Sequence, residues 1–280
     1  MHSDLWQLPG ATYLWQVALH SAVAGTILFT WSRHLELPAG RGRRLLLAAV
    51  LVVPLVTAAV PGRRSATFED QLAWFDSERV LALPVFRALR VGHLVVGLGA
   101  ATILITIGQE ILPALQHVRR SGEPLPTGLG PQVRALPGWE RVTIQAVTGR
   151  PFYVATAGVP GRVPVLQISH DVLAALDADE LAAVLRHENA HWQRRRWLPL
   201  HLLFVARFIQ LYNPVALWVF RAYCLELEIA CDADAVAGAG IGSDSGDPRP
   251  LARALLAFYD RTDPGDLAAR GTLRRRVDIL

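Results

Sequence analysis

Three long apolar runs, separated by arginine-rich loops, dominate the first part of the chain. They comprise residues 13–31, 45–60 and 91–112. A bilayer core of about 30 Å requires about 20 apolar residues in a helix. The first and third runs reach this length, whereas the second needs local thinning of the bilayer or snorkelling by its flanking arginines. The pattern therefore predicts three transmembrane helices and a membrane anchor over residues 1–112.

Beyond this anchor the pattern of apolar and polar positions changes twice. Residues 113–138 include a stretch rich in glycine and proline, which predicts a linker. Three short segments with strand character follow, at 141–147, 151–161 and 163–169. They favour a small antiparallel sheet at the start of a second domain over residues 139–280.

Helical signals dominate the rest of this second domain. Asp177 and Glu180 form a capping-box pattern at the start of a helix that continues to about residue 196. One side of that helix carries the apolar residues Leu181, Val184 and Leu185. A second long helix is predicted over 214–237, followed by a loop at 238–250 and a helical tail from Leu251.

Composition and charge support a membrane protein. Hydrophobic residues make up 52% of the 280 residues, and the net charge of +4 comes from arginine alone because the chain contains no lysine. The arginines cluster beside apolar runs, which fits anionic lipid headgroups better than nucleic acid. Four of them crowd the first loop and place it in the cytoplasm, namely Arg33, Arg41, Arg43 and Arg44. The second domain then starts on the cytoplasmic side.

The segment HENAH contains the strongest chemical signal in the sequence. His187 and His191 are four residues apart, so on a helix both imidazoles lie on one face and can reach the same metal ion. Glu188 lies beside them, where it could take a proton from the attacking water in a zinc peptidase. The alternative is a solvated surface helix that carries two histidines without a metal.

A catalytic zinc ion needs a third protein ligand. Glu228 and Asp232 are also four residues apart, in the segment LELEIACDADA. Glu228 could bind the metal, and Asp232 could accept the second N–H of a ligand histidine. Glu226 is a weaker candidate for the ligand, and an ordinary acidic helix face is the alternative for the whole segment.

The apolar segment 197–220 lies between His191 and Glu228. A single membrane crossing would separate these two residues, and two full crossings would need about 40 residues. The segment is therefore predicted to enter the membrane and return, or to pack within the protein. Asn213–Pro214 is the expected break, because proline cannot continue a helix without disrupting it.

The motifs HENAHWQRRR, LYNPVALWVF and EIACD resemble those of the BlaR/MecR-type signal-transducer peptidases, membrane zinc proteases of the gluzincin type. The resemblance covers roughly residues 140–235. It implies that His187, His191 and Glu228 bind Zn²⁺, that Glu188 is the catalytic base of an HExxH motif, and that Asp232 supports a ligand histidine. Asn189 departs from the family pattern, where a bulky aliphatic residue is usual.

The resemblance predicts a mainly α membrane protein with three N-terminal transmembrane helices. A cytoplasmic gluzincin-like α+β zinc metallopeptidase domain follows, with a small sheet and a re-entrant apolar segment. The extracellular sensor domain of the family's β-lactam receptors is not expected. The predicted location is the bacterial inner membrane, as a multi-pass protein.

The predicted function is regulatory cleavage at the cytoplasmic face, of a transcriptional repressor or of the chain itself. The expected partners are therefore the lipid bilayer and a protein substrate, without direct nucleic-acid binding, and a homodimer stays open. Two alternatives remain, an HtpX-like quality-control protease and a non-catalytic zinc-binding receptor. Cys231, next to the acidic segment, is either a redox-sensing or inhibitory thiol or a small buried residue.

Overall fold

The computed structural model describes residues 9–34, 40–59, 81–87, 89–112, 123–124, 130–134, 136, 139–147, 152–157, 163–194, 199–238 and 246–280. The chain divides into two compact units. The first, called the helical unit, comprises Met1–His117 and His201–Cys224. The second, called the site unit, comprises Val118–Leu200 and Leu225–Leu280.

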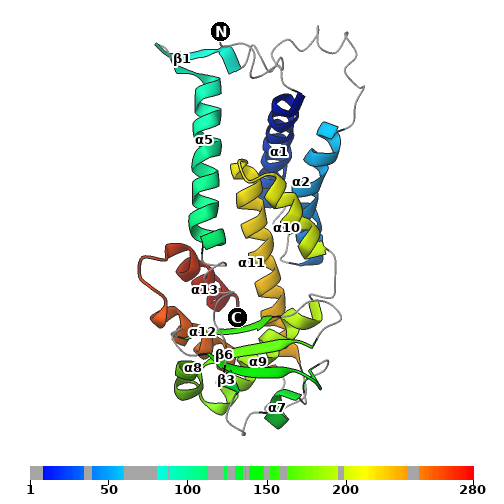
Figure 1. Cartoon of the computed structure of the whole chain (residues 1–280). Helices are drawn as coiled ribbons and strands as arrows, with labels where there is room; N and C mark the ends of the chain where they lie inside the picture. Colours follow the sequence, from blue (N-terminus) through cyan, green and yellow to red (C-terminus); the bar gives the residue numbers. More distant parts are fainter. Residues whose placement is uncertain are drawn as a thin grey trace. The chain divides into compact units, whose positions relative to one another are not determined.

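The helical unit is built from long apolar helices. Its elements are α1 (Pro9–His34), α2 (Arg41–Ala59), the short hairpin β1 (Pro84–Phe86) and β2 (Leu89–Arg90), α5 (Val91–Thr106) with the π-helix η2 (Ile107–Ile111), most of α10 (Pro199–Ile209) and the first half of α11 (Pro214–Ala237). Helices α1 and α2 pack side by side (Figure 1). Their core includes Leu28, Leu47 and Leu51, together with Val219 of α11.

Two described helices are long and apolar enough to cross a membrane, Arg41–Ala59 and Val91–Gln109. Large apolar side chains remain exposed on both, for example Val56 on the first and Leu104 on the second. Such outward apolar surface is expected where lipid, rather than protein, is the neighbour.

The second apolar run makes a longer helix than the sequence indicated. The apolar run 45–60 is short for a bilayer and was expected to need local thinning or snorkelling arginines, but α2 starts at Arg41, ahead of the run, and reaches 19 residues. Helix α1 spans 26 residues but is not among the two candidate spans. Three transmembrane helices therefore stay a prediction.

The apolar segment after the histidine motif is not one continuous helix. Helix α10 ends at Ile209 and α11 begins at Pro214. The side chain of Asn213 accepts hydrogen bonds from the backbone N–H groups of Val215 and Ala216, at 3.1 and 3.5 Å. This N-cap satisfies donors that a helix start leaves without intrahelical partners. The break predicted at Asn213–Pro214 is present, and the path of the segment through a membrane stays a prediction.

A buried polar cluster lies beside this break. Gln210 is fully buried, and its amide nitrogen donates to the carbonyl oxygens of Leu51 and Ala206 at 2.9 and 3.1 Å. Its amide oxygen accepts from the Ser21 hydroxyl at 3.2 Å and from the Asn213 amide at 3.1 Å. One side chain thus links α1, α2, α10 and the start of α11.

The site unit contains a four-stranded sheet with the order β3-β4-β6-β5. The strands are β3 (Glu123–Pro124), β4 (Thr143–Val147), β5 (Val154–Ala157) and β6 (Val165–Ser169). The prediction of an all-antiparallel sheet was wrong, because β6 runs parallel to β4 and antiparallel to β5. Strand β6 lies between the other two, so β5 forms an edge of the sheet.

Residues 113–138 were predicted to be a linker, but their described part contains packed secondary structure. Strand β3 pairs with β4, and a short helix α7 (Gly130–Arg134) follows. Val133 and Leu136 are buried in the core of the site unit. Part of the predicted linker is therefore packed structure, and its residues 113–122, 125–129, 135 and 137–138 lie outside the described part.

The described part of the site unit also contains the second half of α11 and the helices α8 (His170–Ala175), α9 (Ala178–Arg194), α12 (Arg249–Arg261) and α13 (Leu267–Ile279). The predicted capping box is present, because Glu180 N–H donates to Asp177 at 2.8 Å and Asp177 N–H donates to Glu180 at 3.2 Å. Val184 and Leu185 of α9 are buried against the sheet residues Leu166 and Ile168. The apolar face predicted for this helix is thereby confirmed. Most of the predicted loop 238–250 lies outside the described residues.

Candidate metal centre

Helix α9 and the last part of α11 carry the candidate site residues. His187, Glu188 and His191 lie on α9, and Glu228 and Asp232 lie on α11. Two arginines of α9 hold the helices together, because Arg186 donates to the carbonyl of Ala235 at 3.0 Å and Arg194 pairs with Asp234 at 2.6 Å. The two sequence motifs, about 40 residues apart, therefore meet on neighbouring helices.

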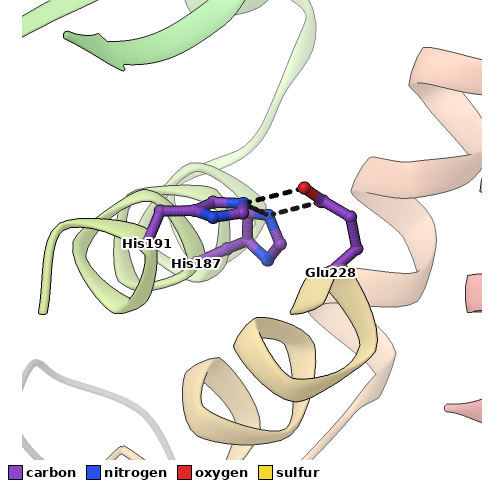
Figure 2. A group of neighbouring side chains, drawn as sticks. All are labelled: His187, His191 and Glu228. Carbon is purple, nitrogen blue, oxygen red and sulfur yellow. Dashed lines mark hydrogen bonds and ion pairs between the residues drawn. The ribbon is translucent and has the colours of Figure 1, made fainter. Parts of the chain in front are cut away.

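Three side chains converge on one point (Figure 2). The Nε2 atoms of His187 and His191 are 3.0 Å apart. Glu228 places Oε2 3.4 Å from His187 Nε2 and Oε1 3.2 Å from His191 Nε2. Among the described residues, this is the group of histidine, cysteine and acidic side chains that could hold a metal ion, with ligand atoms within 4.8 Å of one another.

The separations match what a tetrahedral metal requires. Two ligand atoms bound at 2.0–2.1 Å with tetrahedral angles are about 3.3 Å apart. The three observed separations, 3.0, 3.2 and 3.4 Å, bracket that value, although the last two are measured to different oxygens of Glu228. Two imidazole nitrogens and one carboxylate are also a donor set typical of catalytic zinc. The residues present thus fit a zinc ion in number, type and spacing.

Asp232 holds the ring of His187. Its Oδ1 lies 2.8 Å from His187 Nδ1, so the imidazole donates there and turns Nε2 toward His191 and Glu228. Burial opposes the charged form of this imidazole. The hydrogen bonds to Asp232 and Glu228 outweigh burial and raise the pKa of His187 to about 9. Without a metal, the protonated ring is therefore stabilised by both carboxylates.

The acidic partners stay ionised for the same reason. Burial alone would raise the pKa of Glu228, but hydrogen bonds from His187 and His191 and the charge of Arg276 lower it well below its usual range. Burial would also raise the pKa of Asp232, whereas hydrogen bonds from Arg276 and His187 lower it. Both carboxylates are therefore ready to interact with a cation at neutral pH.

Glu188 lies beside this group without joining it. Its Oε2 accepts a hydrogen bond of 2.9 Å from the backbone N–H of Thr156, in the edge strand β5. Glu188 is also partly exposed, unlike the buried His187 before it. Strand β5 thus fixes one carboxylate oxygen of Glu188, and the other oxygen has no hydrogen-bond partner among the described residues.

Arg276 is the site residue that the sequence did not single out. Only 8% exposed, it forms an ion pair with Glu228 at 3.0 Å and with Asp232 at 2.7 Å. The sequence pattern predicts only a helical tail from Leu251. The spacing of Leu273, Val277 and Leu280 was the available signal, because these apolar positions define a packed face that also includes Arg276.

Cys231 is fully buried between the acidic residues of α11, and its Sγ lies 3.5 Å from His191 Nδ1. Burial is the main reason that the pKa of this thiol rises to about 12. A thiol becomes a nucleophile or sensor through its thiolate. The environment therefore supports the alternative of a small buried residue.

Residues 150–242 match the protein family described as BlaR1 peptidase M56. The predicted resemblance to this family is confirmed over these residues. No curated protein matches the chain. Among solved structures, the crystal structure of S. mikatae Ste24p is similar, with 17% sequence identity and a TM-score of 0.40. The similarity covers 85% of this chain and 64% of that chain.

The converging side chains lie inside the family segment. His187, His191 and Glu228 all fall between residues 150 and 242, whereas Arg276 lies beyond it. The three potential metal ligands are therefore brought together by two helices of the segment that matches the BlaR1 peptidase model.

Proposed function

We propose that the chain is a membrane-embedded zinc endopeptidase in which His187, His191 and Glu228 hold the metal. The observation that carries the proposal is the convergence of these three side chains at separations of 3.0–3.4 Å, beside Glu188, whose Oε2 is held by the Thr156 N–H. When bound, zinc would supply Lewis acidity, which polarises a peptide carbonyl and makes water easier to deprotonate.

Glu188 is the proposed general base. Oε2 is engaged by the Thr156 N–H, so Oε1 is the atom that takes a proton from the attacking water. Attack forms the new C–O bond and converts the carbonyl to a tetrahedral centre. The same oxygen then delivers the proton to the amine as the C–N bond breaks. Each turnover therefore returns Glu188 to the carboxylate form.

Asp232 prepares His187 for this work. Accepting the Nδ1–H of the ring leaves the Nε2 lone pair directed at the metal position. The short, buried contact also restricts rotation of the imidazole. Asp232 thus acts on the metal through His187.

The proposed setting is the bacterial inner membrane, with the site at its cytoplasmic face. Supporting this setting are two helices long and apolar enough to cross a bilayer and the arginines at the start of α2. The motifs favour a regulatory role, with a transcriptional repressor or the chain itself as substrate.

The test compares the wild type with Glu188→Gln, both purified in detergent. Zinc content and cleavage of the chain itself or of an unfolded protein such as casein are measured. We expect one zinc per chain in both proteins and fragments only from the wild type. Equal cleavage by Glu188→Gln would overturn the role of Glu188, and a wild type without zinc would overturn the whole proposal.

Glu180→Gln is the matched control. It removes the same charge from the same helix, and glutamine can still complete the capping box. This control should keep both zinc and cleavage. If zinc is bound but neither substrate is cleaved by the wild type, a non-catalytic zinc-binding receptor replaces the peptidase proposal.

A further inference from the structure

The last helix of the chain brings a guanidinium group to the candidate metal centre. Leu273, Val277 and Leu280 of α13 pack on a cluster that includes Leu251 and Leu255 of α12. This packing turns Arg276 inward, where it is 8% exposed, while the neighbouring Arg275 is exposed. An apolar face on α13 therefore fixes the position of a charged group.

Arg276 binds Asp232 through two parallel contacts. Its Nε donates to Oδ2 and its Nη2 donates to Oδ1, each at 2.7 Å. Planar arginine matches a carboxylate in this bidentate geometry, which fixes orientation as well as adding interaction energy. The Asp232 carboxylate is thus held in the orientation in which Oδ1 also accepts from His187 Nδ1.

The remaining nitrogen reaches the potential metal ligand itself. Arg276 Nη1 lies 3.0 Å from Glu228 Oε2. Nη2 additionally lies 3.3 Å from His187 Nε2. All three guanidinium nitrogens are therefore engaged within the site, and burial separates them from a substrate. Arg276 acts on the centre through its carboxylates and is a positioning residue.

Two electrostatic effects oppose each other at this position. A positive group beside a metal site repels a cation, which would weaken binding. Asp232, however, pairs with the guanidinium at 2.7 Å, so the pair carries little net charge toward the metal position. The main effect of Arg276 on zinc affinity is then the orientation of Asp232 and Glu228. Substituting residues that support metal ligands typically changes metal affinity by about 10–100-fold.

We propose that Arg276 is a determinant of zinc affinity, which positions Asp232 and Glu228 and so couples the docking of α13 to metal binding. The proposal rests on the proposed zinc site at His187, His191 and Glu228. It predicts that the centre keeps its geometry only while the C-terminal helix is in place. It also assigns a role to a residue outside the segment that matches the BlaR1 family.

The test measures zinc affinity by competition with a chromogenic chelator, using the full chain in detergent. Arg276→Gln should weaken binding by about 10–100-fold. Arg276→Lys keeps the charge but cannot make the bidentate contact with Asp232, so its zinc affinity should lie between those of Arg276→Gln and the wild type. Arg275→Gln, which removes the same charge from the exposed face of α13, should bind within about twofold of the wild type.

Unchanged or tighter binding by Arg276→Gln would overturn the proposal. Folding of Arg276→Gln is checked by its unfolding transition without metal. If this transition is not cooperative, the variant is not folded and the test uses Arg276→Lys instead. Zinc affinity equal to that of the wild type in Arg276→Lys would then overturn the proposal. A wild type that binds no zinc contradicts the proposed function instead, so the two failures are distinguishable.

A double variant separates positioning from general stabilisation. If Arg276 acts through Asp232, adding Arg276→Gln to Asp232→Asn should weaken zinc binding by much less than the two single effects combined. Additive losses would mean that Arg276 does not work through Asp232 and would overturn this route.

Discussion

The helical unit and the site unit each bury polar side chains, and the two clusters are organised differently. In the helical unit, Gln210 meets four partners, and donors face acceptors in each contact. In the site unit, the Nε2 atoms of His187 and His191 face each other at 3.0 Å with the Glu228 carboxylate beside them. The first arrangement is complete by itself, whereas the second concentrates groups that a cation would bring together.

This difference separates two uses of buried polarity. A complementary network stabilises one packing of helices, because breaking it leaves buried groups without hydrogen bonds. A convergence of electron-pair donors is costly unless a proton or a metal occupies the space between them. Without metal, a proton on His187 lowers this cost, in agreement with the raised pKa of about 9. A bound zinc ion would lower the cost in the same way. Substitutions in the Gln210 cluster should therefore change the stability of the fold, whereas substitutions at His187, His191 and Glu228 should change zinc affinity.

The largest effect is expected for Glu228→Gln. The amide keeps an oxygen near both histidines but removes the negative charge, so zinc affinity should fall by more than about 100-fold, beyond the range typical of supporting residues. Chelator competition on the purified chain measures this loss. Glu226→Gln is the control, because the buried Glu226 lies on the same helix but outside the converging group. A stronger loss of zinc in Glu226→Gln than in Glu228→Gln would assign the ligand to Glu226.

Most of this site could be predicted because its parts are local in sequence. The i, i+4 spacing of His187 and His191 needs only a helix, and α11 has the predicted bounds, Pro214–Ala237, because proline starts it and glycine follows it. The capping box at Asp177 likewise depends on residues three apart.

The missed features depend on pairing between distant segments. Strand direction in the sheet is set by β6 inserting between β4 and β5, which local alternation of apolar residues does not encode. Arg276 is 89 residues from His187 and sits among three consecutive arginines that composition alone does not distinguish. Only the packing of α13 selects the one that turns inward.

A smaller effect, on stability rather than zinc, is expected for Gln210→Leu. Leucine has a similar volume but leaves the Ser21 hydroxyl, the Asn213 amide and the Leu51 carbonyl without this partner. An unsatisfied buried group costs about 1–3 kcal/mol, so the variant should be less stable by at least that amount. Unfolding in detergent, followed by tryptophan fluorescence, measures the change.

Zinc affinity of Gln210→Leu should stay within about threefold of the wild type, since the replaced contacts belong to the helical unit. Phe208→Leu provides the control, because Phe208 is 56% exposed and contributes less to packing. A loss of zinc as large as that of the site variants would contradict the separation drawn between the two clusters.

The smallest effect is expected for Cys231→Ala. The thiol is fully buried and its pKa is raised to about 12, so little thiolate forms at neutral pH. Its contact with His191, at 3.5 Å, is a weak one. Zinc affinity should therefore change by less than about threefold, because a thiol is only a weak hydrogen-bonding group.

Dilute hydrogen peroxide should leave the zinc content of the folded wild type unchanged. If peroxide does remove zinc from the wild type and Cys231→Ala prevents this loss, the redox-sensing alternative is correct. Oxidation of this buried, protonated thiol would then require local opening of the α9–α11 pair.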